Sequence, residues 1–266
     1  MGEYRSAAPL QIDDDGVTMQ QLRMGEGAHV LVANGFLSQS VTGWDRWKRA
    51  VTERYPGHPV SRVRWEAQAL ESLKPLEAAL ETGGDPAKLI AEAKRQLLNP
   101  IEALRAGKRP DLPVPAIVLE APAKWAAAKH RATDTGKALA EAIKNTPDEQ
   151  KFILCGFSLG ARVMATAALT LAEQGIHDKL IAVHLVGAAI SQDPKWQLMS
   201  EAVTEGVWNY WSKNDSVLST LYRIAEGGAT PFGLAGMHLD DPKLHDIDVS
   251  NEVFTHRGYL PVIAFD

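Results

Sequence analysis

KFILCGFSLGARV, residues 151–163, is the stretch that decides the fold, because an apolar run passes through two glycines around Ser158 into small residues that tolerate a helix. Its centre, GFSLG, matches the pattern GxSxG, in which a sharp strand-to-helix turn holds a serine in a strained backbone conformation and exposes its hydroxyl. A side chain at Gly156 or Gly160 would collide where the strand and the helix come close. The pattern predicts that Ser158 is a nucleophile; a tight turn with an inert serine is the alternative.

Apolar runs rich in β-branched residues recur on both sides of this stretch, and most are followed by turn residues and a helical pattern. This alternation is typical of a mainly parallel sheet, so the predicted fold class is α/β. Helices are predicted over 133–145 and 161–175, the second ending at Gly175. The predicted strands are 28–35, 58–65, 151–157, 179–187 and 206–212, with a weaker strand at 244–254 and an antiparallel edge strand at 17–24.

Residues 66–132 depart from this rhythm. Two helical stretches rich in alanine and leucine, 66–81 and 85–98, are joined by GGDP and followed by the proline-rich RPDLPVP. We interpret the segment as a helical insertion within a single domain spanning residues 1–266, a length that suits one α/β core. A lid over the site and simple packing against the sheet both fit its composition.

Composition narrows the classes of partner. The formal net charge of -5 provides no basic surface for nucleic acid, and the single cysteine, Cys155, excludes an internal disulfide. No Cys/His cluster has zinc spacing, the N-terminal stretch MGEYRSAAPLQIDDDG has no apolar core of signal-peptide type, and no apolar run approaches the length of a membrane span. We therefore expect a cytoplasmic protein that needs no metal or cofactor, with peripheral membrane contact and the oligomeric state left open.

Ser158 needs a histidine that accepts its proton and a carboxylate that orients this histidine, in the chain order Ser, Asp or Glu, His. Four of the eight histidines, at positions 29, 58, 130 and 177, precede the allowed positions or lie too close to Ser158 in the sequence, and His184 stands in an apolar run where packing is favoured. His256 follows the last strand-like segment and is the predicted base. His238 and His245, in the preceding loop, are the alternatives.

Asp215 is the predicted acid, because it directly follows the strand predicted over 206–212, at the end where open α/β sheets carry their functional loops. Asp193 follows the preceding strand and is the rival, although a position before Pro194 also suits an ordinary turn residue. The later aspartates are interpreted as solvated or capping groups; they are Asp240, Asp241, Asp246 and Asp248.

Attack by a serine would place negative charge on the carbonyl oxygen of the substrate, so two preorganised N–H donors are needed. The backbone N–H of Leu159 is one candidate, and that of Phe36 in NGFLSQ, residues 34–39, is the other; a plain turn after a buried strand is the alternative. Phe36, Leu37 and Trp44 are the predicted substrate-binding residues. The tryptophans at 44, 47, 65, 208 and 211 fit either an apolar acyl pocket or the core.

These blocks resemble one family within the α/β-hydrolases, the transmembrane and coiled-coil-domain hydrolase-like proteins and their microbial relatives, long catalogued as a domain of unknown function. The resemblance rests on segments in family order, from NGFLSQ and VRWEAQAL through GFSLGARV and HLVGAAI to WNYWSKNDSVLSTLYR and DIDVSNEVFTHRGY. It implies an α/β-hydrolase domain with Ser158, Asp215 and His256 in the triad positions. Eukaryotic members carry hydrophobic spans that this chain lacks, so it resembles a soluble, microbial-type member.

Together, the residues and the resemblance predict a serine hydrolase that cleaves carboxylic esters through an acyl-enzyme, with lipid-like or medium-chain acyl esters as its substrates. Thioester cleavage and acyl transfer to an alcohol use the same three residues and remain alternatives. An alternative from another class is a binding module that keeps the hydrolase fold without turnover.

Overall fold

The computed structural model describes residues 10–12, 17–35, 43–65, 88 and 114–266. Its strands form one sheet in the order β1-β2-β4-β3-β5-β6-β7-β8. The pairs β1/β2 and β2/β4 are antiparallel, and every neighbouring pair from β4 to β8 is parallel. The strands are β1 (Leu10–Ile12), β2 (Val17–Arg23), β3 (His29–Ala33), β4 (Val60–Arg64), β5 (Phe152–Phe157), β6 (Leu180–Val186), β7 (Val203–Trp211) and β8 (Leu244–Asp248).

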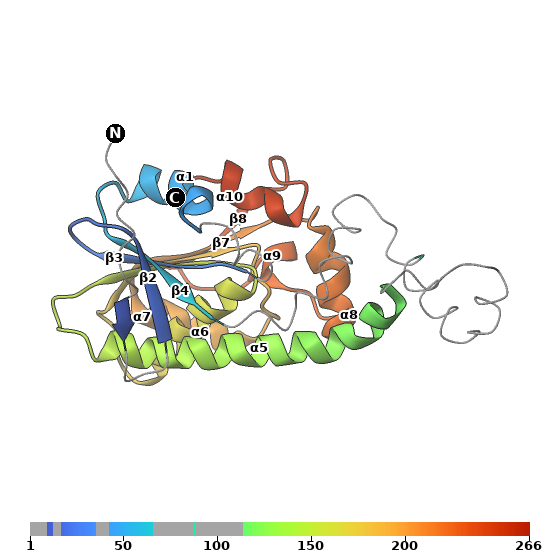
Figure 1. Cartoon of the computed structure of the whole chain (residues 1–266), viewed down its shortest axis with the longest axis horizontal. Helices are drawn as coiled ribbons and strands as arrows, with labels where there is room; N and C mark the ends of the chain where they lie inside the picture. The colour runs from blue at the N-terminus through green and yellow to red at the C-terminus, as the bar shows by residue number, and fades with distance from the viewer. Residues whose placement is uncertain (1–9, 13–16, 36–42, 66–87, 89–113) are drawn as a thin grey trace.

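Helices cover both faces of the sheet, with α5 and α6 on one side and α1 and α10 on the other (Figure 1). The long helices are α1 (Gly43–Arg54), α5 (Val114–Lys144) and α6 (Leu159–Glu173). The short elements follow β6, β7 and β8: η2 (Pro194–Leu198), α7 (Met199–Ala202), η3 (Leu218–Tyr222), α8 (Arg223–Ala225), α9 (Phe232–Ala235), η4 (His256–Gly258) and α10 (Tyr259–Val262).

The strand predictions are confirmed, with one addition and one correction. β1 was not predicted, because three residues are too few to show a periodicity. Since β1 pairs with the outer side of β2, β2 is antiparallel as expected but does not form the edge of the sheet.

Helix α5 is longer than the sequence pattern indicated. The predicted helix over 133–145 is the last part of a helix that begins at Val114, although Pro122 lies inside it. Alanine-rich sequence favours a helix here, and Trp125, Ala128 and Ala132 bury completely or almost completely against the core. Part of the predicted insertion is therefore helix α5, whereas its stretches 66–87 and 89–113 lie outside the described residues.

Helix α6 is almost entirely buried between the sheet and α5. The two helices approach closely at Gly136 of α5, where a Cβ atom would stand 2.6 Å from both Cβ of Thr166 and the carbonyl oxygen of Val163. Any larger residue at position 136 would push the helices apart. This packing holds α6, and with it the end of β5, in a rigid position.

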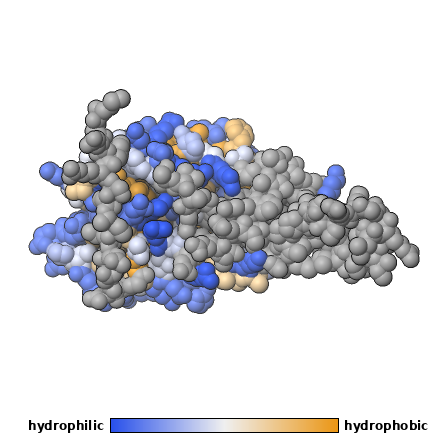
Figure 2. Space-filling model, viewed as in Figure 1, coloured by the Kyte–Doolittle hydropathy of each residue, from blue (hydrophilic) through white to orange (hydrophobic). Residues whose placement is uncertain are grey.

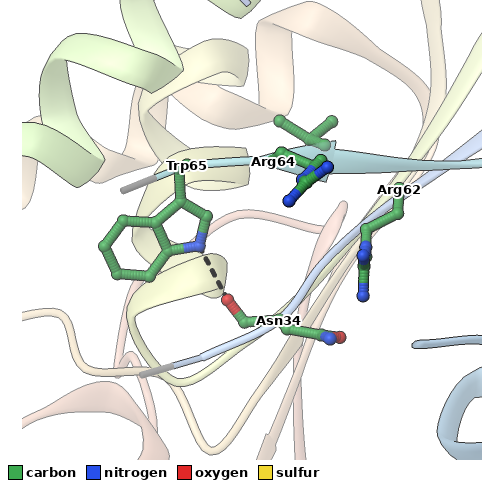
Figure 3. A pocket seen from close by; sticks show the side chains of 5 residues that line it. Asn34, Arg62, Arg64 and Trp65 are labelled. Atoms are coloured by element: carbon green, nitrogen blue, oxygen red, sulfur yellow. Dashed lines mark hydrogen bonds between the residues drawn. The ribbon is translucent and has the colours of Figure 1, made fainter. Parts of the chain in front are cut away.

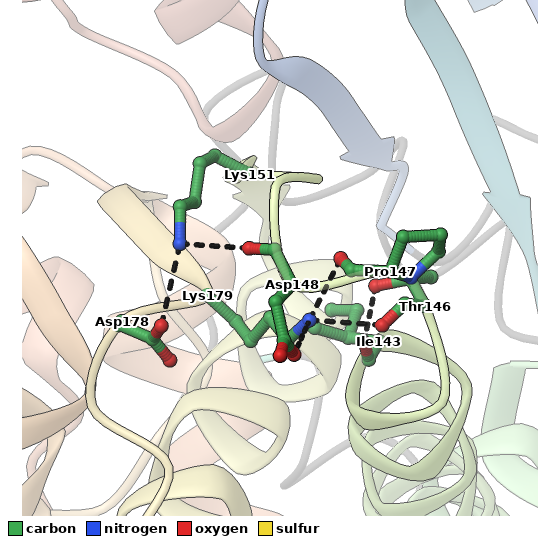
Figure 4. A network of polar contacts seen from close by, with 7 residues as sticks. All are labelled: Ile143, Thr146, Pro147, Asp148, Lys151, Asp178 and Lys179. Carbon is green, nitrogen blue, oxygen red and sulfur yellow. Dashed lines mark hydrogen bonds and ion pairs between the residues drawn. The ribbon is translucent and has the colours of Figure 1, made fainter.

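A buried lysine, Lys179, bonds the turn after α5 near the amino ends of β5 and β6 (Figure 4). The Lys179 ammonium donates to the carbonyl oxygens of Thr146 and Pro147 at 2.9 and 2.8 Å, and it lies 3.3 Å from Asp148. Its cation thus bonds carbonyl groups of the turn that directly follows α5, and it lies near the negative C-terminal end of the helix dipole. The backbone of Phe152 also donates to the carbonyl of Lys179, which ties β5 to the start of β6.

His184 is fully buried on the α1 face, in agreement with the predicted packing role. Its Nε2 lies 2.6 Å from the Tyr55 hydroxyl, its Nδ1 lies 3.3 Å from the Tyr210 hydroxyl, and Phe265 stacks on the ring at 4.1 Å between centroids. Burial, with a smaller effect of Arg54, lowers the pKa of His184 to about 3. The native protein therefore keeps this imidazole neutral.

This neutral histidine makes the free energy of unfolding depend on pH. Below about pH 6.5 the unfolded chain protonates His184 and the native chain does not, so this residue alone lowers the free energy of unfolding by up to about 1.4 kcal/mol for each pH unit down to about pH 3. Urea unfolding at several pH values measures the slope. We expect a shallower slope in His184→Gln and the wild-type slope in the exposed control His177→Gln; equal slopes in all three proteins would contradict this origin.

Candidate active site

Ser158 occupies the sharp turn between β5 and α6. Its backbone has φ 57° and ψ -120°, a left-handed conformation that costs energy in a residue with a side chain. The glycines allow this turn: a Cβ at Gly156 would lie 2.4 Å from the carbonyl oxygen of Gly160, and one at Gly160 would lie 2.2 Å from that of Ala33 in β3. The steric role expected for these two glycines is thus present.

The structure brings the side chains of Ser158, His256 and Asp215 together in a hydrogen-bonded line. His256 Nε2 lies 3.0 Å from Ser158 Oγ, and His256 Nδ1 lies 2.6 Å from Asp215 Oδ2. All three residues are at most 2% exposed. With its proton on Nδ1, the imidazole donates to the carboxylate and leaves Nε2 to accept from the serine hydroxyl. This arrangement is chemically able to activate the hydroxyl as a nucleophile.

Asp215 and His256 come from turns that follow β7 and β8, at the same edge of the sheet as Ser158. The backbone N–H of Leu218 donates to Asp215 Oδ1 at 2.9 Å, so the second carboxylate oxygen faces His256. Ser212 and Asn214 join the two turns: the Ser212 hydroxyl donates to the carbonyl of Val253 at 2.7 Å, and Asn214 Nδ2 donates to that of Ser250 at 2.7 Å.

These two joining residues were missed in the sequence, although Asn214 stands next to Asp215. A polar residue in a turn is most simply interpreted as solvent-exposed. The residue that Asn214 bonds lies 36 positions away, so no local pattern indicates the contact.

Aromatic rings enclose the imidazole. The Phe157 ring lies 4.9 Å from that of His256, and Tyr259 stands edge-on at 6.5 Å. The Tyr259 hydroxyl donates to the carbonyl of Gly233 at 3.0 Å. Burial and the nearby Asp215 carboxylate raise the pKa of Tyr259 well above its usual value, so it stays neutral and adds no charge beside the histidine.

The alternative histidines have other partners. His245 lies on β8 with its ring stacked on Trp208 at 5.1 Å, and the backbone N–H of His238 donates to Asp246. The rival acid, Asp193, caps η2 by accepting from the backbone N–H of Lys195 at 3.0 Å. Within the part of the chain that the structure describes, no cluster of three or more His, Cys, Asp or Glu side chains is arranged to hold a metal ion.

Gly35, two residues after β3, lies directly beside Ser158. A Cβ atom at this position would be only 2.6 Å from Cβ of Ser158, so the close approach requires a glycine. Asn34 is held by two indole groups: Trp47 Nε1 donates to its side-chain oxygen at 2.6 Å, and Trp65 Nε1 donates to its carbonyl at 2.8 Å. Figure 3 shows the second of these bonds, in a small pocket lined by Asn34, Arg62, Val63, Arg64 and Trp65.

Of the candidate oxyanion and substrate-binding residues, the structure describes Leu159 and Trp44. Leu159 is the first residue of α6, where a backbone N–H has no intrahelical acceptor and is available to a ligand. Phe36 and Leu37 lie outside the described residues. Trp44, on α1, is half-buried with the Arg23 guanidinium 5.1 Å from its ring, and it packs against the cluster on the α1 face.

The tryptophans mostly belong to the core. Trp47 and Trp65 are buried, and Trp208 stacks on the ring of His184 at 5.1 Å. The described surface visible in Figure 2 is mainly hydrophilic. Among the described residues, the large apolar side chains that are exposed are Met24, Leu198 and Phe254.

A mainly parallel sheet flanked by helices on both faces, with a serine on a strand-to-helix turn and His256 and Asp215 beside it, is an α/β-hydrolase fold. The chain belongs to the DUF726 family, described as "Protein of unknown function", whose sequence model matches residues 50–264.

Two relatives are uncharacterized membrane proteins. One, from Schizosaccharomyces pombe, is 32% identical over 142 residues, 53% of this chain and 24% of that protein. The other, from Caenorhabditis elegans, is 30% identical over 145 residues, 51% of this chain and 22% of that protein. The chain thus spans less than a quarter of the length of these relatives. Among the residues that the structure describes, no helix combines the length and the apolar character needed to cross a membrane.

Solved structures with a related arrangement include a dienelactone hydrolase from Anabaena variabilis, 13% identical, covering 95% of this chain and 87% of that one with a TM-score of 0.41. The mouse alpha/beta hydrolase domain-containing protein 10 is 14% identical, covering 95% of this chain and 88% of that one with a TM-score of 0.42.

Proposed function

We propose that this chain is a serine hydrolase that cleaves carboxylic esters through an acyl-enzyme. The observation that carries the proposal is the hydrogen-bonded line from Ser158 Oγ through His256 to Asp215, with Ser158 in a strained turn at the start of α6. Such an arrangement lowers the barrier to acyl transfer because the base, its orienting carboxylate and the nucleophile are already positioned.

In the proposed reaction, His256 Nε2 takes the proton of Ser158 as Oγ attacks the ester carbonyl, and Asp215 stabilises the resulting imidazolium. The protonated His256 then gives its proton to the departing alcohol as the carbon–oxygen bond of the ester breaks. A water molecule, deprotonated by His256, attacks the acyl-enzyme and releases the acid and free Ser158. The backbone N–H groups of Leu159 and Phe36 would stabilise the oxyanion in both steps.

We further propose lipid-like or medium-chain acyl esters as substrates, bound beside the nucleophile by Phe36, Leu37 and Trp44. The aromatic surroundings of His256 support an apolar site. Thioester cleavage and acyl transfer follow the same steps with another leaving group or acceptor, and the chemistry of the triad does not rank them.

A chain-length series of p-nitrophenyl esters tests this proposal. If the acyl chain is buried, kcat/KM rises about fourfold for each methylene that the site accommodates, because burying a methylene contributes about 0.8 kcal/mol. We expect octanoate to exceed acetate by at least about tenfold. A clear preference for acetate would contradict the long acyl pocket alone, whereas no enzymatic turnover of any ester would contradict the hydrolase itself.

A further inference from the structure

Arg162 is a buried cation one helical turn after Ser158. Only 8% of the residue is exposed, and its Nε donates to the carbonyl oxygen of Ala189 at 3.2 Å. The backbone N–H of Ala189 in turn donates to the carbonyl of Ser158 at 3.2 Å, so two hydrogen bonds link the guanidinium to the nucleophile's backbone. Side chains in a helix tilt toward its N-terminus, which for α6 is the end that carries Ser158.

The surroundings of Arg162 leave a surplus of positive charge. Among the described residues, no carboxylate lies within 4.0 Å of its guanidinium. Glu226, whose negative charge acts on Arg162, already accepts from Lys129 at 2.7 Å and from the indole of Trp125 at 3.0 Å. Lys129 and Arg162 thus share the negative charge of one carboxylate, and a buried cation that is only partly compensated is costly.

The Tyr222 hydroxyl lies beside this cation, and the Ser191 hydroxyl is hydrogen-bonded to that of Tyr222. Tyr222 is close enough to Arg162 for its phenol to act on the guanidinium charge, and its hydroxyl lies 2.6 Å from Oγ of Ser191. Trp125 packs edge-on against Tyr222 at 5.5 Å and holds the phenol in place. A guanidinium carries five N–H donors in a planar fork, a shape that matches the oxygens of a carboxylate or a phosphate.

We propose that Arg162, with the hydroxyls of Ser191 and Tyr222, binds an oxyanion on the ester substrate, either a carboxylate or a phosphate group. The inference rests on the proposed hydrolase function and narrows it to anionic esters. The bound anion would supply negative charge in direct contact with the guanidinium, which no described carboxylate provides.

Matched esters test this subsite. On the acyl side, mono-p-nitrophenyl adipate is compared with p-nitrophenyl hexanoate; on the alcohol side, 4-acetoxybenzoate and 4-acetoxyphenyl phosphate are compared with methyl 4-acetoxybenzoate. The quantity of interest is the factor by which Arg162→Gln lowers kcat/KM for each ester, because intrinsic ester reactivity cancels in that factor. We expect a loss about 10- to 100-fold larger for an anionic ester than for its neutral partner.

The variants and outcomes separate binding from folding. Arg162→Lys should recover part of the selectivity, and Arg223→Gln, at the exposed arginine that follows Tyr222 in the sequence, is the matched control for a lost positive charge. If Arg162→Gln lowers kcat/KM selectively for the phosphate ester, the subsite binds a phosphate group. If the selective loss is confined to the carboxylate esters, the subsite binds a carboxylate. Equal losses for neutral and anionic esters in folded Arg162→Gln would overturn the subsite and leave Arg162 as a structural donor to Ala189.

A binding measurement keeps the subsite testable if the wild-type chain hydrolyses no ester, an outcome that contradicts the proposed function. Inorganic phosphate and adipate are then titrated calorimetrically into the wild type and Arg162→Gln. Binding of either probe that weakens at least about tenfold in the variant supports the subsite. Absence of binding, or equal binding in both proteins, overturns it.

Discussion

A Ser158→Ala variant is expected to hydrolyse p-nitrophenyl butyrate about 10⁴- to 10⁶-fold more slowly than the wild-type chain, because the nucleophile and its base act as one unit. The loss should appear in kcat, since the hydroxyl at 3.0 Å from His256 supplies the bond that forms during the reaction. The loss of kcat is measured from steady-state rates, and acylation is followed by the pre-steady-state burst of p-nitrophenol. The variant keeps the backbone of the turn, so its circular dichroism and urea midpoint should stay close to those of the wild type.

Labelling by a fluorophosphonate probe separates this enzyme from a binding module on the same fold. We expect the wild type and Ser200→Ala to be labelled and Ser158→Ala to remain unlabelled; Ser200 bonds Gln197 and Asp241 near η2 and serves as a control serine. Equal ester turnover in Ser158→Ala and the wild type, or a wild type that resists the probe, would contradict the role proposed for Ser158.

An Asp215→Asn variant should lose about 10³- to 10⁴-fold in kcat with little change in KM. The amide removes the negative charge that stabilises the imidazolium, and its NH₂ group favours the tautomer with the proton on Nε2, which cannot accept the serine proton. The bond at 2.6 Å between Asp215 and His256 is therefore the contact under test. The kcat of p-nitrophenyl butyrate hydrolysis between pH 6 and 9 is the measurement.

The rival acid provides the matched control. Asp193→Asn should retain turnover, because asparagine also caps a helical turn and the described partners of the Asp193 carboxylate are the backbone N–H and the exposed ammonium of Lys195 in η2. A larger loss in Asp193→Asn than in Asp215→Asn would transfer the acid role away from Asp215.

Much of the fold was predictable because its signals are local. Hydrophobic runs marked seven of the strands, and the glycines at 156 and 160 marked the turn through the space that a strand and a helix need to approach. Chain order and position after a strand singled out Asp215 and His256, which the structure places in contact. The catalytic roles of these residues remain proposals that the variants above test.

The other features depend on which distant segments pack together. A three-residue strand such as β1 exists because β2 offers a free edge, and α5 continues through Pro122 because Trp125 finds a buried place against the core. The indole bonds to Asn34 and the isolation of the Arg162 cation likewise arise only when separate elements meet.

The sequence by itself determined the α/β class, the strand-to-helix turn at Ser158 and the order of its candidate partners, because these follow from periodicity and from steric rules within a few residues. Only the tertiary structure decided which histidine meets Ser158, which hydrogen bonds hold Asp215 and where a buried cation stands beside the site. The contacts of His256 with Asp215 and Ser158 join residues 41 and 98 positions apart, and their distances are set by the packing of the whole sheet.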